Sequence, residues 1–240
     1  MYKVMIKNAS FQKNTDDMKK FLLVAITSLL TTLSAGAQEV WTGRQFRSFH
    51  GDVPVYYGIR IGAAFSHVNS DDKMLDGGSL KAGLNIGGLV GVQITRNAPV
   101  YFEAGLSYIQ KGGIGYVYSE NGNSRSKFKY NLDYIELPFC FKYKYDFNYH
   151  MSLQPFLGGY FALGVGGKIR DFGERKAYGS FSDDEYSFRR FDGGLRFGCG
   201  FNYDLFYVEI GYEFGLANIC HDAFDTSHNG CLQLNVGMNF

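Results

Sequence analysis

Apolar and polar residues alternate with a period of two in eight separate segments of the chain. In the clearest segment, residues 134–145, Leu137, Phe139 and Phe141 fall on one face while Glu136 and Lys142 fall on the other. This periodicity indicates a β-strand with one apolar face. The eight segments are 57–66, 81–94, 100–108, 134–145, 152–165, 191–202, 206–216 and 231–240. Most hold roughly ten residues or a little more, which is the length that a tilted strand needs to cross a membrane.

The connections between these segments alternate between short and long. The short ones are 95–99, 146–150 and 203–204. The long ones are rich in Ser, Asn, Asp and Gly and span 69–79, 112–129, 168–189 and 218–229. Short turns on one side and long loops on the other are typical of outer-membrane barrels. The pattern therefore predicts an all-β fold: an eight-stranded antiparallel up-and-down transmembrane β-barrel over residues 56–240.

A soluble, lipocalin-like barrel is the main alternative, because alternation alone does not say which face looks inward. Glycines fall mainly on the polar face, where a narrow lumen needs small residues, and aromatic residues gather beside the short turns. The polar face also carries equal numbers of opposite charges, as a closed lumen requires, since an unpaired charge there is costly. These features favour the transmembrane form. The predicted lumen charge network is Arg60, Lys81, Glu103, Glu136, Lys142, Lys144, Asp192, Arg196, Glu209 and Glu213.

The last segment ends on an aromatic residue after strict alternation. Leu234, Val236, Met238 and Phe240 share one face. This ending resembles the C-terminal signal by which the barrel-assembly machinery recognises outer-membrane barrels for insertion. An edge strand of a secreted sandwich is the alternative, but such a strand would leave an apolar face in water.

The start of the chain carries the features of an export signal. Lys19 and Lys20 precede an apolar run over 21–33, and small residues lead to Ala37 and Gln38. We expect a cleaved signal peptide over 18–37, cut between Ala37 and Gln38, because the apolar run is too short to span a bilayer. Residues 1–17 would then lie upstream of the true start, and 38–55 would form a periplasmic lead-in. The resulting localisation is the outer membrane of a Gram-negative bacterium.

The composition agrees with a strand-rich envelope protein. The chain has 31 Gly, 18 Tyr and 22 Phe but 4 Pro, a balance that favours strands over linkers. The formal net charge of +1 gives no general field for nucleic acid, so we expect no nucleic-acid partner. Outer-membrane lipid and the barrel-assembly machinery are the expected partners.

Candidate chemistry is sparse in this sequence. Cys220 and Cys231 bracket the last long loop, and an oxidising compartment permits a disulfide between them; free thiols are the alternative. No serine stands in a recognised nucleophile motif, and no His and Asp spacing matches a known metal site. We therefore expect no catalytic residue, metal or cofactor.

Several stretches together resemble the PorT-like outer-membrane barrel family of Bacteroidota. They are residues 132–143, 154–160 and 191–200 and the terminal Phe240. The resemblance implies an integral outer-membrane protein without known catalysis, and PorT itself is linked to protein export. The leading hypothesis is a closed, non-enzymatic barrel that acts as a structural, interaction or export-accessory component with envelope or secretion proteins. A small pore or ligand-binding barrel is the alternative, and a lipid-modifying enzyme is favoured less.

Overall fold

The computed structural model describes residues 54–71, 75, 79–118, 125–172, 176–182, 186–220 and 226–240. The expected signal peptide over 18–37, its cleavage point at Ala37 and Gln38, the upstream 1–17 and nearly all of the lead-in lie outside these residues.

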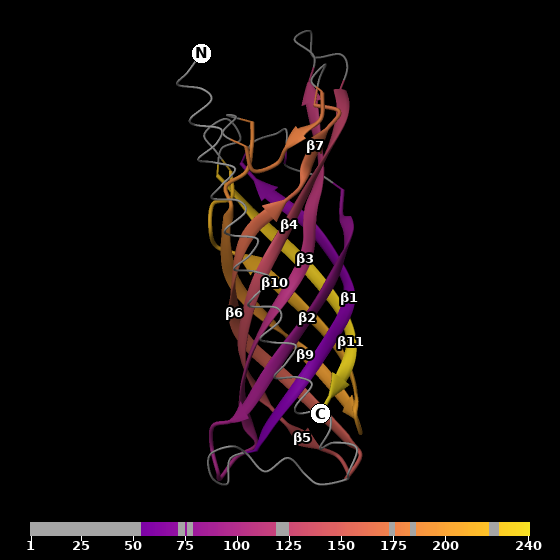
Figure 1. Ribbon diagram of the computed structural model, residues 1–240, viewed down its shortest axis with the longest axis vertical. Coiled ribbons are helices and arrows are strands. Elements are labelled where there is room, and N and C mark those ends of the chain that lie inside the picture. The colour runs from indigo at the N-terminus through magenta and orange to yellow at the C-terminus, as the bar shows by residue number, and fades with distance from the viewer. Residues whose placement is uncertain are drawn as a thin grey trace, which may run out of the picture. The chain divides into compact units, whose positions relative to one another are not determined.

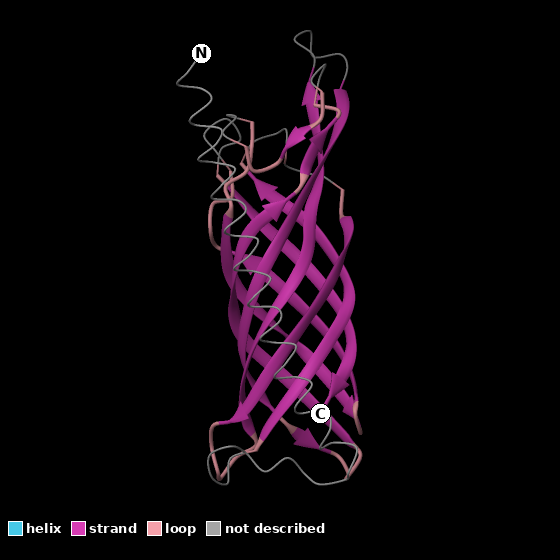
Figure 2. Cartoon of the chain, viewed as in Figure 1, coloured by secondary structure: helices cyan, strands magenta, loops and turns pink. Residues whose placement is uncertain are grey.

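Eight long antiparallel strands close into a ring (Figures 1 and 2). Each pairs with the next along the chain, and the last pairs back with the first. The predicted eight-stranded all-β barrel is therefore confirmed. The long strands are β1 (Val55–Ser70), β2 (Lys81–Gln93), β3 (Val100–Tyr118), β4 (Arg125–Tyr143), β6 (Met151–Gly166), β9 (Phe191–Tyr203), β10 (Phe206–Gly215) and β11 (Ser227–Asn239). Three short strands are β5 (Tyr145–Asp146), β7 (Lys168–Arg170) and β8 (Tyr178–Gly179).

The strand registers fix the stagger of the ring. Starting at Tyr56, one circuit of paired residues returns to Ser66, ten residues further along β1. The circuit runs through Tyr56, Gly91, Glu103, Cys140, Gly158, Arg196, Glu213, Cys231 and Ser66. With a rise of about 3.3 Å per residue and a strand spacing of about 4.7 Å, this stagger corresponds to a strand tilt of roughly 40°, within the range for closed barrels.

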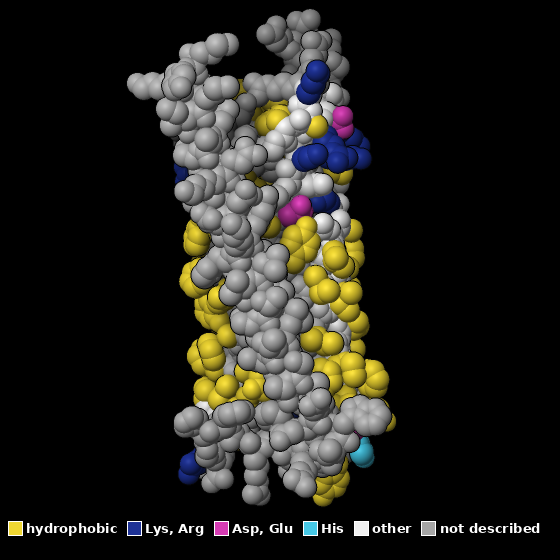
Figure 3. Space-filling view, in the orientation of Figure 1, with side chains coloured by type: hydrophobic (Ala, Val, Ile, Leu, Met, Phe, Trp, Pro, Cys, Tyr) yellow, Lys and Arg dark blue, Asp and Glu magenta, His cyan; other side chains and the backbone are white. Residues whose placement is uncertain are grey.

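The two faces of the barrel wall carry opposite kinds of side chain. On β10, Val208 and Ile210 point outward and are 54% and 53% exposed, whereas Tyr207 and Glu209 point inward and are buried. Apolar side chains cover the outer surface of the ring (Figure 3). A lipocalin-like carrier would have the reverse arrangement, so the structure rules out that alternative.

Two predicted loops contain strand instead. Residues 112–129 were expected to be a long connection, but β3 continues to Tyr118 and β4 already begins at Arg125. Residues 168–189 hold β7 and β8, and β7 pairs with β4. β3, β4, β7 and β8 thus form a four-stranded sheet that extends from one end of the ring (Figure 1). The expectation failed because the outer face of this region is polar and its apolar side chains point inward, the reverse of the lipid-facing part of the ring.

An apolar cluster fills the loop end of the barrel. Inward side chains of β4 pack against β7 and against the segments before β9 and β11; Phe128 and Phe172, for example, meet edge to face at 4.9 Å. The cluster consists of Ala64, Val68, Leu75, Ile109, Phe128, Tyr130, Leu132, Tyr134, Tyr160, Ala162, Ile169, Phe172, Phe188, Ile219, Cys220 and Cys231. Its buried rings cap the lumen on the side of the long loops.

The final residue lies at the closure of the ring. The backbone N–H of Phe240 donates to the carbonyl of Tyr57 at 2.7 Å, and the N–H of Tyr57 donates back at 3.0 Å. Leu234 and Val236 point outward from β11 and are exposed. This placement is compatible with the expected insertion signal, whose role stays a prediction.

A charge on the outer wall should cost stability if that wall faces lipid. We expect Ile210→Arg to lower the free energy of unfolding by about 2–4 kcal/mol, because the side chain lies midway along β10. Ile210→Ala serves as the control, and urea unfolding from lipid vesicles is the measurement. Equal losses for the two variants would show that this face is not in the bilayer.

Candidate functional site

The lumen is filled by two clusters of buried charges. We name them the Lys111 cluster (Lys111, Glu136, Asp192 and Glu213) and the Lys142 cluster (Lys142, Glu103, Glu209, Arg196 and Tyr207). The residues come from β3, β4, β9 and β10, where a period of two turns them all inward. All of these side chains are buried, so the clusters replace water inside the ring.

The Lys111 cluster places three carboxylates around one ammonium group. Lys111 Nζ lies 3.0 Å from Glu136 Oε2, 2.9 Å from Glu213 Oε2 and 3.5 Å from Asp192 Oδ2. The ring of Tyr160 lies 4.1 Å from the same nitrogen, a distance at which the aromatic face attracts a cation. Asn229 also donates to Asp192 Oδ2 at 2.8 Å. Lys111 therefore holds four strands together across the lumen.

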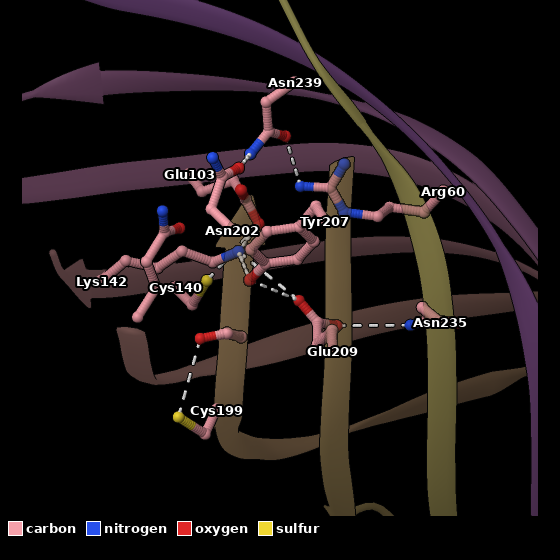
Figure 4. A network of polar contacts seen from close by, with 12 residues as sticks. Arg60, Glu103, Cys140, Lys142, Cys199, Asn202, Tyr207, Glu209, Asn235 and Asn239 are labelled. Atoms are coloured by element: carbon pink, nitrogen blue, oxygen red, sulfur yellow. Dashed lines mark hydrogen bonds and ion pairs between the residues drawn. The ribbon is translucent and has the colours of Figure 1, made fainter. Parts of the chain in front are cut away.

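The Lys142 cluster, whose contacts are drawn in Figure 4, lies closer to the short turns, because Glu103 and Lys142 stand near the start of β3 and the end of β4. Lys142 Nζ lies 2.9 Å from Glu103 Oε1 and donates to the hydroxyl of Tyr207 at 2.8 Å. Its third neighbour is Glu209 Oε2 at 3.5 Å. The hydroxyl of Tyr56 donates to the other oxygen of this carboxylate, Glu103 Oε2, at 2.7 Å.

Arg196 joins the two clusters. Its Nη2 lies 2.5 Å from Glu209 Oε1, and its Nη1 lies 3.9 Å from Glu213 Oε1. Amide side chains extend the link: Asn235 donates to Glu209 at 3.3 Å, and Gln233 donates to Glu213. The polar interior is therefore one continuous network, which strengthens each of its bonds in a medium with little water.

Little space remains inside the ring. A cavity of about 30 Å³ lies between the walls near Asn85, Glu103 and Arg196, room for about one or two water molecules. A larger cavity of about 190 Å³ opens at the short-turn end, beside Tyr101, Lys144 and Gln154.

The sequence also matches a known family over most of the barrel. The model of the outer membrane protein beta-barrel domain family matches residues 45–221. The chain belongs to this family. It is thus an outer-membrane protein of a Gram-negative bacterium, with its apolar wall in lipid. No curated protein matches the sequence.

Solved structures of low sequence identity resemble the barrel. Ail, the attachment invasion locus protein of Yersinia pestis, is 17% identical, with 77% of this chain and 98% of that chain covered and a TM-score of 0.39. Neisserial surface protein A is 15% identical, with 77% and 97% covered and a TM-score of 0.43. The N-terminal barrel domain of Pseudomonas aeruginosa OprF is 12% identical, with 76% and 97% covered and a TM-score of 0.33.

Within this outer-membrane barrel, the structure places eight of the ten predicted network residues in the lumen as buried side chains. They are Arg60, Glu103, Glu136, Lys142, Asp192, Arg196, Glu209 and Glu213. Arg60 has no acidic partner among the described residues; it bonds to Asn239 Oδ1 at 2.6 Å and stacks over the ring of Tyr207 at 3.9 Å. Lys81 is half-buried and donates to the backbone carbonyl of Lys111 at 2.8 Å.

Lys144 lies at the mouth of the lumen, at the edge of the buried network. It is about one-third exposed and pairs with Asp146 at 3.1 Å beside the short turn. β4 ends at Tyr143, so Lys144 lines the open cavity at the short-turn end and is reached by water. A pattern read along one strand does not show where the chain begins to turn.

The sequence reasoning missed Lys111, the centre of the larger cluster. It lies on the same inward row as Glu103 and Ile109, and the alternation continues through it. The signal was present in the sequence, but the predicted third segment ends at Tyr108, three residues before Lys111. Counting every second residue onward from Glu103 leads to Lys111 as an inward-facing side chain.

No metal or helical membrane site appears in the described part of the chain. There, no three His, Cys, Asp or Glu side chains form a group that could hold a metal ion. Within the same ranges, no helix has the length and apolar character to cross a bilayer. None of the four cysteines forms a disulfide, and Cys220 and Cys231 lie buried in the apolar cluster without a bond between them.

Loss of the central ammonium should destabilise the barrel strongly. We expect Lys111→Met to lower the free energy of unfolding by about 3–5 kcal/mol, because three carboxylates lose their buried counter-charge. Lys144→Met, which removes an exposed ion pair, should cost within about 1 kcal/mol. Urea unfolding in vesicles measures both variants. Adding Glu136→Gln to Lys111→Met should recover part of the loss; equal costs for the two single variants would contradict the network.

The state of the cysteines is open to a direct test. We expect the unfolded, unreduced protein to take up four maleimide labels, because none of its four cysteines forms a disulfide in the structure. Intact-mass measurement gives the count. Two labels instead of four, with Cys220→Ser restoring the reactivity of Cys231, would establish the disulfide.

Proposed function

We propose that this barrel is a non-enzymatic component with a closed lumen that acts through its ends, as a structural, interaction or protein-export accessory protein. The observation that supports this most is the continuous ion network from Lys142 to Lys111, capped by the apolar cluster. A lumen filled in this way leaves no wide water path. The resemblance to the PorT-like barrels of Bacteroidota supports the export-accessory form of the proposal.

The alternatives find less support in the geometry. The 190 Å³ cavity at the short-turn end is smaller than the roughly 300–1,000 Å³ of most small-molecule sites. A lipid-modifying enzyme would need a nucleophile and a base in contact. His150 Nδ1 lies 2.6 Å from Asp204 Oδ1 at an exposed turn, but no described serine or cysteine bonds to this histidine.

The pore alternative predicts a current that the closed lumen does not. We expect the purified barrel in planar bilayers to give no discrete conductance steps, and Glu209→Gln to remain silent as well. Steps in the wild-type protein whose size changes in Glu209→Gln would show that the lumen conducts and would overturn the closed-lumen proposal.

A deletion strain tests the accessory role. We expect loss of the gene to reduce protein secretion or envelope integrity, and the wild-type gene to restore it. The measurements are the secreted proteome and leakage of periplasmic enzymes. Unchanged secretion and integrity together with altered solute uptake would favour a pore, and a changed mass of the membrane glycolipid would favour an enzyme.

A further inference from the structure

Four cations lie together on one face of the sheet that extends beyond the ring. Lys127 and Lys129 belong to β4, and Lys168 and Arg170 belong to β7. Lys129 and Arg170 are direct cross-strand partners. Lys127 and Lys168 each lie two residues from one of these partners, so all four side chains share a face. We call these four residues the basic face.

The basic face is exposed, and its four cations form no ion pair within the described part of the chain. All four side chains are exposed, and none forms an ion pair with a residue that the structure describes. Like charges directly opposite each other on a sheet are destabilising. The lumen cations show the contrasting case, since Lys111, Lys142 and Arg196 all lie against carboxylates.

The apolar cluster holds the basic face in place. Phe128 and Tyr130 alternate with its two lysines on β4, and Ile169 lies between its two residues on β7. These three side chains are fully or almost fully buried. The cations are therefore carried by fixed strands, and their spacing is set by the strand register.

The position of the basic face relative to the membrane points to its ligand. On β4 the outward row runs from Lys129 through Asn131 and Asp133 to Ile135, where the apolar wall begins. Six residues at about 3.3 Å each, tilted by roughly 40°, put Lys129 about 15 Å above Ile135 along the barrel axis. Figure 3 shows Lys and Arg side chains gathered above the apolar band. The cations thus lie just above the lipid chains, at the level of the sugars and phosphates of the outer leaflet.

We propose that the basic face binds the phosphates of the glycolipid that forms the outer leaflet around the barrel. Juxtamembrane cations attract anionic headgroups within about one Debye length. Two adjacent strands with two cations each offer several donors to one phosphorylated headgroup. The phosphate also relieves the repulsion between Lys129 and Arg170. This binding is independent of the proposed accessory role, and either can fail without the other.

The test uses the full-length folded barrel in an uncharged detergent, with purified lipopolysaccharide as the probe and its dephosphorylated form as the comparison. We expect K129E/R170E to bind lipopolysaccharide at least about 10-fold more weakly than wild type. The matched control is R96E/K144E, which makes the same charge change beside the short turns, at exposed Arg96 and partly exposed Lys144, and should bind like wild type. The difference in affinity between wild type and K129E/R170E should shrink at 0.5 M salt.

Folding of each variant is verified by heat-modifiable mobility in gels. If K129E/R170E does not fold, K129Q/R170Q replaces it, and K129R/R170K should keep wild-type binding. Equal binding of dephosphorylated lipopolysaccharide, or equal weakening in R96E/K144E, would overturn the proposal. So would tight binding of heparin by a barrel that does not bind lipopolysaccharide, because the face would then serve a soluble polyanion.

Discussion

The pairing of charges inside a ring too narrow for bulk water is the constraint on which this barrel depends. An ion taken out of water is stabilised only when partners surround it closely. Lys111 meets that condition with three carboxylates, and Lys142 meets it with two carboxylates and the hydroxyl of Tyr207. Because the partners come from strands far apart in sequence, the same contacts that satisfy the charges also fix the ring.

Glycines on the inner face of the wall leave room in the lumen for the large side chains of this network. Gly91 lies under the ring of Tyr56, and Gly200 lies under the ring of Tyr207; a Cβ at either glycine would overlap the tyrosine. Tyr56 and Tyr207 in turn hold Glu103 and Lys142. These two glycine–tyrosine pairs share one packing arrangement, in which a large ring crosses the lumen above a glycine of the neighbouring strand.

The architecture could be predicted from the sequence because the alternation within each strand shows which of its residues share a face. Alternation along β10 fixed the positions of Val208 and Glu209 without knowledge of any neighbour. The partners of Glu209 could not be read in this way, because they depend on registers between strands that the sequence does not state. The extension of β3 and β4 was missed for another reason: Lys127 and Lys129 make the segment look like a solvated loop, while Phe128 and Tyr130 are buried on its other side.

The pairing of β1 with β11 has a consequence for biogenesis. Each of the other ring neighbours is joined by a local connection, but this seam brings together the first and last strands of the ring, from Gly58 with Asn239 to Ser70 with Ser227. Synthesis and export proceed from the N-terminal side. The backbone groups on one edge of β1 therefore have no strand to pair with until β11 has been exported. The ring can close only once β11 is present, so the hydrogen bonds of this seam are among the last that the barrel can form.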